Sequence, residues 1–173
     1  PLAGSTFKKV YYDQAVGRAV SKFVPADELV VPYTATSLDD AEAIIHVIKM
    51  PENELRKQQV SGFYRDVDLG PPGRVETNPV VKKERELEGT KATGKPQAIY
   101  TLLECHVNLD LEGFEEVGAD GQPTGIKLPY IVTIDESTRT VLSIRRNYAP
   151  DDPKKDKIQY FVHFKFLPGL GFY

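Results

Sequence analysis

Tryptophan is absent from this 173-residue chain, and cysteine and methionine each occur only once. With Cys105 as the single cysteine, no disulfide can form within the chain, so an oxidising compartment is not indicated. No apolar run approaches the roughly 20 residues that a membrane-spanning helix needs. No charged segment followed by an apolar core marks a signal peptide. These absences predict a soluble domain of the reduced, intracellular type.

The chain also lacks an excess of basic residues: it has 22 Lys and Arg residues and 25 Asp and Glu residues, which gives a net charge of −3. This balance argues against a stand-alone nucleic-acid-binding protein, which normally carries a basic face. The composition is 40% hydrophobic and 27% charged, as in ordinary globular domains. Nine Tyr and eight Phe residues favour β-strands.

The first half of the chain reads as short strands with a single clear helix. Proline and glycine mark the breaks: Pro32 indicates an edge strand or a strand end, Pro51 opens a helix at its first position, and Gly62 ends that helix. Ser37 is a candidate N-cap for a helical turn. The predicted strands are 7–12 and 19–23, paired as a hairpin, then 29–33 and 44–50.

Residues 66–97 form a long polar stretch broken by proline and glycine, within which 79–87 is a candidate solvated helix. We interpret 66–97 as a flexible surface excursion. Beyond it, alternation of apolar and polar residues predicts long strands over 99–111, 126–134, 141–147 and 158–166.

Together these patterns predict an α+β fold, mainly an antiparallel β-meander with one or two short helices over its apolar face. The whole chain, 1–173, is expected to form a single β-rich domain. In the strand 99–111, the odd-numbered residues form an apolar face, whereas Glu104 and His106 lie on a mixed face.

The three histidines, His46, His106 and His163, are the candidate metal ligands, and each lies in a predicted strand. His106 and His163 would be close if their strands pair. No pair of histidines has metal-site spacing, and Cys105 points away from His106, so histidines on a half-exposed sheet face are the preferred interpretation.

Other candidate groups indicate no enzyme. Cys105 lies mid-strand on the predicted apolar face, where a thiol is normally inert. The acidic stretch from Asp110 to Asp120 lacks the ligand spacing of an EF-hand loop. Arg145 and Arg146 cannot share one strand face, and the lysines around Lys154 are interleaved with aspartates that would repel phosphate. We therefore expect no catalytic, cofactor-binding or metal-binding residues.

The runs GIKLPYIVTID and VLSIRRN, between Gly125 and Asn147, resemble segments of the portal proteins of short-tailed, podovirus-type phages and prophages. The most specific part of this resemblance is the closing run YFVHFKFLPGLGFY, and further support comes from FKKVYYD and SGFYRDV. The apolar end of the chain and its start at Pro1 without Met fit a piece of a longer protein.

The resemblance implies a structural module of a head-to-tail connector, corresponding to its β-rich wing. The full-length protein would form a homo-dodecameric ring at one vertex of the virion, contacting capsid, terminase and DNA during packaging and ejection. Assembly would take place in the bacterial host cytoplasm. The chain by itself is expected to be a monomer or weak dimer with no direct nucleic-acid binding and no membrane contact.

Two alternatives remain at this point. One is a β-rich interaction domain of another virion or host-contact protein, which would self-associate through a sheet edge. The other is a small hydrolase or metal-dependent enzyme, which requires His106 and His163 to converge with a carboxylate.

Overall fold

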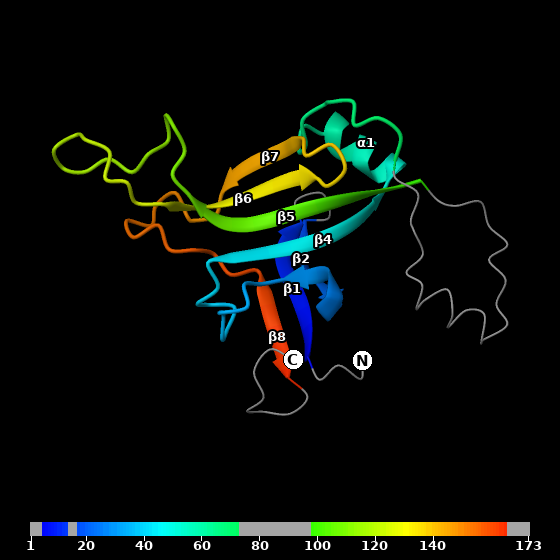
Figure 1. Cartoon of the computed structure of the whole chain (residues 1–173), viewed down its shortest axis with the longest axis horizontal. Helices are drawn as coiled ribbons and strands as arrows, with labels where there is room; N and C mark the ends of the chain where they lie inside the picture. The colour runs from blue at the N-terminus through cyan, green and yellow to red at the C-terminus, as the bar shows by residue number, and fades with distance from the viewer. Residues whose placement is uncertain (1–4, 14–16, 73–97, 166–173) are drawn as a thin grey trace, which may run out of the picture.

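The computed structural model describes residues 5–13, 17–72 and 98–165. These residues form two antiparallel sheets, one α-helix and one 3-10 turn (Figure 1), which confirms the predicted α+β class dominated by antiparallel sheet. The elements are β1 (Ser5–Asp13), β2 (Arg18–Val24), η1 (Ala26–Glu28), β3 (Leu29–Val30), β4 (Ala43–Pro51), α1 (Glu52–Val60), β5 (Ile99–Leu109), β6 (Leu128–Asp135), β7 (Val141–Arg146) and β8 (Phe161–Lys165).

The larger sheet is a five-stranded meander in the order β3-β4-β5-β6-β7. Every neighbouring pair is antiparallel, with Ile44 opposite His106 and Cys105 opposite Val132. The strand expected at 158–166 was assigned to this meander, and that assignment is wrong, because β8 lies in the other sheet and pairs with β1. Its alternating pattern defines two faces for the strand but does not specify its partner.

The smaller sheet has the order β2-β1-β8 and includes the predicted N-terminal hairpin. In this hairpin Phe7 is opposite Val24, and on its other side Phe7 is opposite His163 of β8. Most of the predicted connecting turn lies outside the described residues. The strands of the two sheets run in clearly different directions where they meet (Figure 1).

The principal core lies between the two sheets. Its buried apolar side chains come from β1, β2 and β8 on one side, from β3 and β4 on the other, and from the segment that joins β3 to β4. They are Phe7, Val24, Leu29, Leu38, Ala41, Ile44 and Phe161. Burying apolar side chains from both sheets in one cluster stabilises their contact.

The sequence predicts that the apolar face of β5 is the buried one, but in the structure the mixed face is more deeply buried. Tyr100, Leu102, Glu104 and His106 on the mixed face are buried, whereas Cys105 and its neighbours on the apolar face are only half-buried. The mixed face is the one covered, by α1 at one end and by the smaller sheet at the other. Burial here therefore follows what packs on the strand rather than its average hydrophobicity.

Helix α1 packs against β4 and β5, so it covers the mixed face of β5 and not the apolar face expected from the sequence. This second cluster buries apolar side chains from α1, the segment after it, β5 and β7: Leu55, Tyr64, Leu69, Tyr100, Leu102 and Leu142. The Tyr100 hydroxyl also donates a 2.7 Å hydrogen bond to the Gly70 carbonyl. Residues 66–72, assigned to the surface excursion, thus reach the core at Leu69, and the helix predicted at 79–87 lies outside the described residues.

The ends of α1 follow the predicted breakers with one difference. Pro51 is the N-cap, with φ −62° and ψ 147°, rather than the first helical residue. Gly62 follows the C-cap with φ +76°, a conformation that glycine adopts without steric cost. Within the described residues no helix is long and apolar enough to cross a bilayer.

The helical turn predicted at Ser37 is instead a hydrogen-bonded turn. The Asp40 carboxylate accepts from the Thr36 hydroxyl at 2.6 Å and from the Ser37 backbone N–H at 2.7 Å. These bonds, that of Thr36 foremost, lower the pKa of Asp40. They resemble a helix cap, but the chain enters β4 at Ala43 before a helix can form.

Candidate functional site: a buried charge cluster between the sheets

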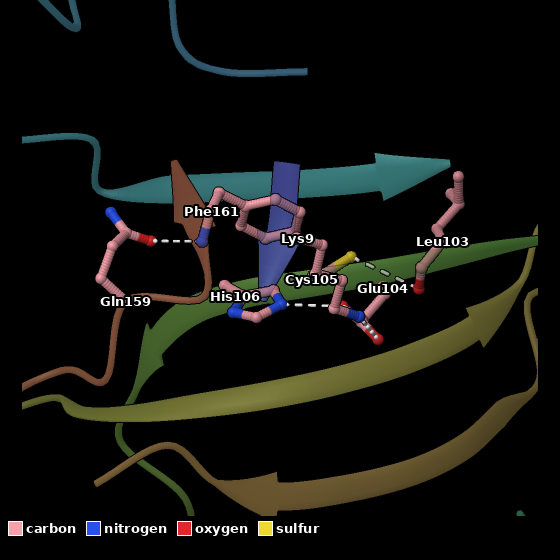
Figure 2. Close-up of polar contacts among 7 residues, drawn as sticks. All are labelled: Lys9, Leu103, Glu104, Cys105, His106, Gln159 and Phe161. Carbon is pink, nitrogen blue, oxygen red and sulfur yellow. Dashed lines mark hydrogen bonds and ion pairs between the residues drawn. The ribbon is translucent and has the colours of Figure 1, made fainter. Parts of the chain in front are cut away.

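A buried ion pair joins the two sheets. Lys9 of β1 places its Nζ 2.5 Å from Glu104 Oε1 and 2.7 Å from Oε2, so the lysine contacts both carboxylate oxygens. The side chains are 15% and 8% exposed, respectively. Figure 2 shows them meeting from β1 and β5. Because water is largely excluded, the two charges depend on each other for stabilisation.

Two histidines flank this pair. His106 Nε2 lies 2.8 Å from Glu104 Oε1, and because a carboxylate can only accept, Nε2 carries the proton. His46 is directly opposite Glu104 in the β4–β5 register. Both imidazoles meet the Phe161 ring edge-on, at centroid distances of 5.1 Å for His106 and 5.7 Å for His46. Phe161 of β8 thus closes the cluster from the smaller sheet.

The cluster shifts the acidity of its members. Burial alone would raise the pKa of Glu104, but the hydrogen bond from His106 and the charge of Lys9 outweigh it and hold this pKa at about 2. Burial lowers the pKa of His46 to about 4, and the nearby Lys9 charge acts in the same direction. At neutral pH the cluster therefore holds an ionised carboxylate, its lysine and a neutral His46.

Polar residues continue across the larger sheet from Glu104. Thr133 of β6 is opposite Glu104, and Ser143 of β7 is opposite Thr133. Tyr64 covers this row, and its pKa is raised to about 12, chiefly by burial and then by the charge of Glu104. Beyond the row, the Arg145 guanidinium lies 4.1 Å from the centroid of the Phe63 ring. The larger sheet is therefore polar across its middle on the covered face.

The chemistry open to this cluster is limited by its contacts. Glu104 is held ionised by a pKa near 2 and both of its oxygens are engaged, so it is a poor proton acceptor at neutral pH. Within the described ranges, no group of three or more His, Cys, Asp or Glu residues could hold a metal ion. The arrangement is suited to fastening one sheet to the other.

The structure places in different sheets the two histidines that the sequence singled out as a possible pair. His106 lies on β5 of the larger sheet, whereas His163 lies on β8 and stacks on Phe7 at a centroid distance of 4.7 Å. Their strands do not pair, so the condition for their proximity is not met. His46, which no spacing argument linked to His106, is the histidine that shares the Glu104 cluster.

The remaining candidates are dispersed. Burial raises the pKa of the Cys105 thiol, which lies on the opposite face of β5 from His106. Arg145 contacts Phe63 and Arg146 lies 6.0 Å from the centroid of the Phe114 ring, as expected for residues on opposite strand faces. In the acidic stretch, Glu116 forms an ion pair with Lys155.

Sequence reasoning did not single out Lys9 or Glu104. They are 95 residues apart and belong to different sheets, so no local pattern links them. The available indication was a glutamate in the middle of a long, otherwise buried strand, because a buried carboxylate requires a partner.

Acid is expected to destabilise the protein in two stages, and His46 accounts for the first. The unfolded chain protonates His46 near pH 6.5 and the folded chain only near pH 4, so stability is fully present above 6.5 and falls as pH drops through this window. Glu104 extends the loss from about pH 4.5 down to about 2. In urea denaturation at a series of pH values, His46→Gln should abolish the loss of stability between pH 6.5 and 4. The loss of stability at lower pH, which Glu104 causes, should remain. An unchanged profile would contradict this assignment.

A scan against protein-family models found no match for this chain, and a search of curated proteins found none.

Proposed function

We propose that this chain is a structural and assembly module of a phage portal protein and performs no catalysis. The proposal draws on the resemblance of its sequence runs to portal proteins of short-tailed phages. The ring formed by the full-length protein would serve DNA packaging and ejection at one vertex of the virion. The charge cluster fits this role, since its ionised groups are engaged in joining the two sheets.

The observation that carries the assembly role is an apolar face on the outside of the smaller sheet. Phe23, Val162 and Phe164 are 58%, 45% and 45% exposed, and each belongs to a regular strand. Exposed apolar groups of this kind on a folded surface mark sites of contact with other proteins. A module whose buried charges fasten its sheets and whose outer face is apolar is suited to assembly.

The test is the assembly state of the whole gene product that carries this chain. Electron microscopy and light-scattering mass should show closed rings of about a dozen subunits, because head-to-tail contacts that close produce cyclic symmetry. A full-length product that stays monomeric across salt conditions would overturn the portal proposal. The alternative of an interaction domain from another virion or host-contact protein would then take its place.

A further inference from the structure

Three polar side chains on β7 and just beyond it share one face of the larger sheet. Strand β7 is the last strand of this sheet, and alternation places Ser143 and Arg145 on its covered face. Asn147 continues the pattern, because its N–H donates to the Pro129 carbonyl of β6 at 2.9 Å. The next residue, Tyr148, packs in the apolar cluster on the opposite face. We call Ser143, Arg145 and Asn147 the β7 polar strip.

The β7 polar strip is buried but has no protein partner within the described ranges. Asn147 is 1% exposed, and neither its Nδ2 nor its Oδ1 has a hydrogen-bond partner among the residues that the structure describes. The same holds for Arg145 Nε and Ser143 Oγ, which are also buried atoms. Burying polar groups without partners is costly, and native proteins rarely do so. The strip therefore requires a partner that the described side chains and backbone do not supply.

The spacing of the strip suits a bridging molecule. Alternate residues on a strand are about 7 Å apart, whereas a direct hydrogen bond spans only about 3 Å. A single small molecule bonded to two groups joins them across about 5–6 Å. The strip is also enclosed, since the Phe63 ring lies 4.1 Å from the Arg145 guanidinium and Ile158 N–H donates to the Asn147 carbonyl at 3.0 Å.

The mixture of donors and acceptors identifies the class of ligand. The Asn147 amide offers both an oxygen acceptor and an N–H donor, whichever way it is turned, and Arg145 Nε is a donor only. An anion would accept from the N–H groups but leave the amide oxygen unpaired. A metal cation would be repelled by the Arg145 guanidinium and leave the donors unpaired. Water both donates and accepts, so it matches all of these groups.

We propose that the β7 polar strip is an internal water site. A water molecule accepts from Arg145 Nε and donates to Asn147 Oδ1, and further water on the strip serves Ser143 Oγ. The site lies where the chain leaves the larger sheet on its way to β8 of the smaller one, so bound water stabilises this crossing. It would exist whether or not the chain assembles into a ring.

Nuclear magnetic resonance of the unaltered chain tests the site directly. The probes are the water resonance and the side-chain N–H protons of Arg145 and Asn147. Bound water gives cross-peaks whose sign relative to the diagonal reverses between nuclear and rotating-frame Overhauser spectra, whereas proton exchange keeps one sign. We expect reversing cross-peaks at both side chains. Chloride titration should leave both side-chain signals unshifted, because an anion does not fit the amide oxygen.

Asn147→Leu provides a second measurement, because leucine has a similar volume and no polar side-chain atoms. If the amide binds water, the variant removes the bridge and leaves Arg145 Nε buried without it, so the equilibrium constant for unfolding should rise about tenfold. If the amide were dry and unpaired, leucine would remove the cost of burying it and the constant would fall.

Asn108→Leu is the matched control for this variant. Asn108 is an exposed asparagine on β5 of the same sheet, opposite Pro129. Its replacement should change the unfolding constant by no more than about threefold, as for most surface positions. The water cross-peaks of Arg145 and Asn147 should remain in this variant.

Four outcomes would overturn the water site. The first two are the absence of reversing cross-peaks to water and saturable shifts on adding chloride, which would indicate an anion site. The third is a hydrogen bond from the Asn147 amide to a protein group in place of water. The fourth is an Asn147→Leu variant at least as stable as the unaltered chain. The first three are measured on the unaltered chain, so the test does not depend on the folding of a variant.

Discussion

Replacing Lys9 with methionine is expected to lower the free energy of unfolding by about 3–5 kcal/mol, the range for a buried ion pair that loses one partner. The methionine fills the space of the lysine stem but leaves Glu104, whose side chain is 8% exposed, without its counter-charge. The pKa of Glu104 should then rise from about 2, because the burial that opposes ionisation remains while the lysine charge is gone. Urea denaturation at pH 7 measures the loss.

Two further variants separate this interpretation from a general effect of removing a charge. Adding Glu104→Gln to Lys9→Met should recover much of the loss, because a neutral amide needs no counter-charge and its oxygen can still accept from His106. Arg56→Met provides the exposed comparison, since Arg56 pairs with Asp66 and their side chains are 57% and 64% exposed. It should change stability by no more than about 1 kcal/mol. Equal, small effects of Lys9→Met and Arg56→Met would contradict a buried junction.

Truncation of Phe161 to alanine is the second large effect, with an expected loss of about 3–5 kcal/mol. Phe161 is 2% exposed and belongs to the core between the sheets, where it also contacts the rings of His46 and His106. Removing the ring leaves a cavity between the sheets and deprives both imidazoles of their apolar cover. Thermal or urea denaturation measures the loss of stability.

The position of Phe161 predicts where the loosening occurs. Hydrogen exchange in Phe161→Ala should accelerate first in β8 and β1, because local opening follows the elements that lose packing. Leu142→Ala is the matched control: Leu142 is 0% exposed but lies in the cluster under α1. It should reduce stability similarly without preferential exchange in β8. If both variants accelerate exchange in the same strands, Phe161 does not act as a specific anchor.

The parts of the fold that the sequence predicted are those set by local patterns. The β1–β2 hairpin follows from two short strand-like runs, and β5 follows from an alternation that gives one apolar and one mixed face. The placement of β8 is not local, because its alternating pattern fits either sheet equally well. Its partner depends on packing, in which Phe161 fills the space against His46 and His106.

Local sequence patterns do not predict the candidate site, for a similar reason. Histidine spacing directed attention to His106 and His163, but topology brings His46 to Glu104 through the β4–β5 register. Lys9 reaches the cluster only because β1 lies in the sheet that covers β5. A buried carboxylate in a strand predicts that a cation must approach it, but the strand pattern alone does not identify the cation.

The pairing of β1 with β8 places strong demands on the order of folding. Residues Ser5 and Lys165 are opposite each other, so everything between them must be synthesised before β1 gains its second neighbour. At ribosomal speeds of roughly 5–20 residues per second, β8 would emerge about seven to thirty seconds after the N-terminal hairpin. During that time Lys9 can form its ion pair with Glu104 only after β5 has emerged. Phe7 cannot stack on His163 until β8 has emerged. The face of the hairpin that carries Phe7 and Val24 therefore stays uncovered until the strands that bury it have emerged.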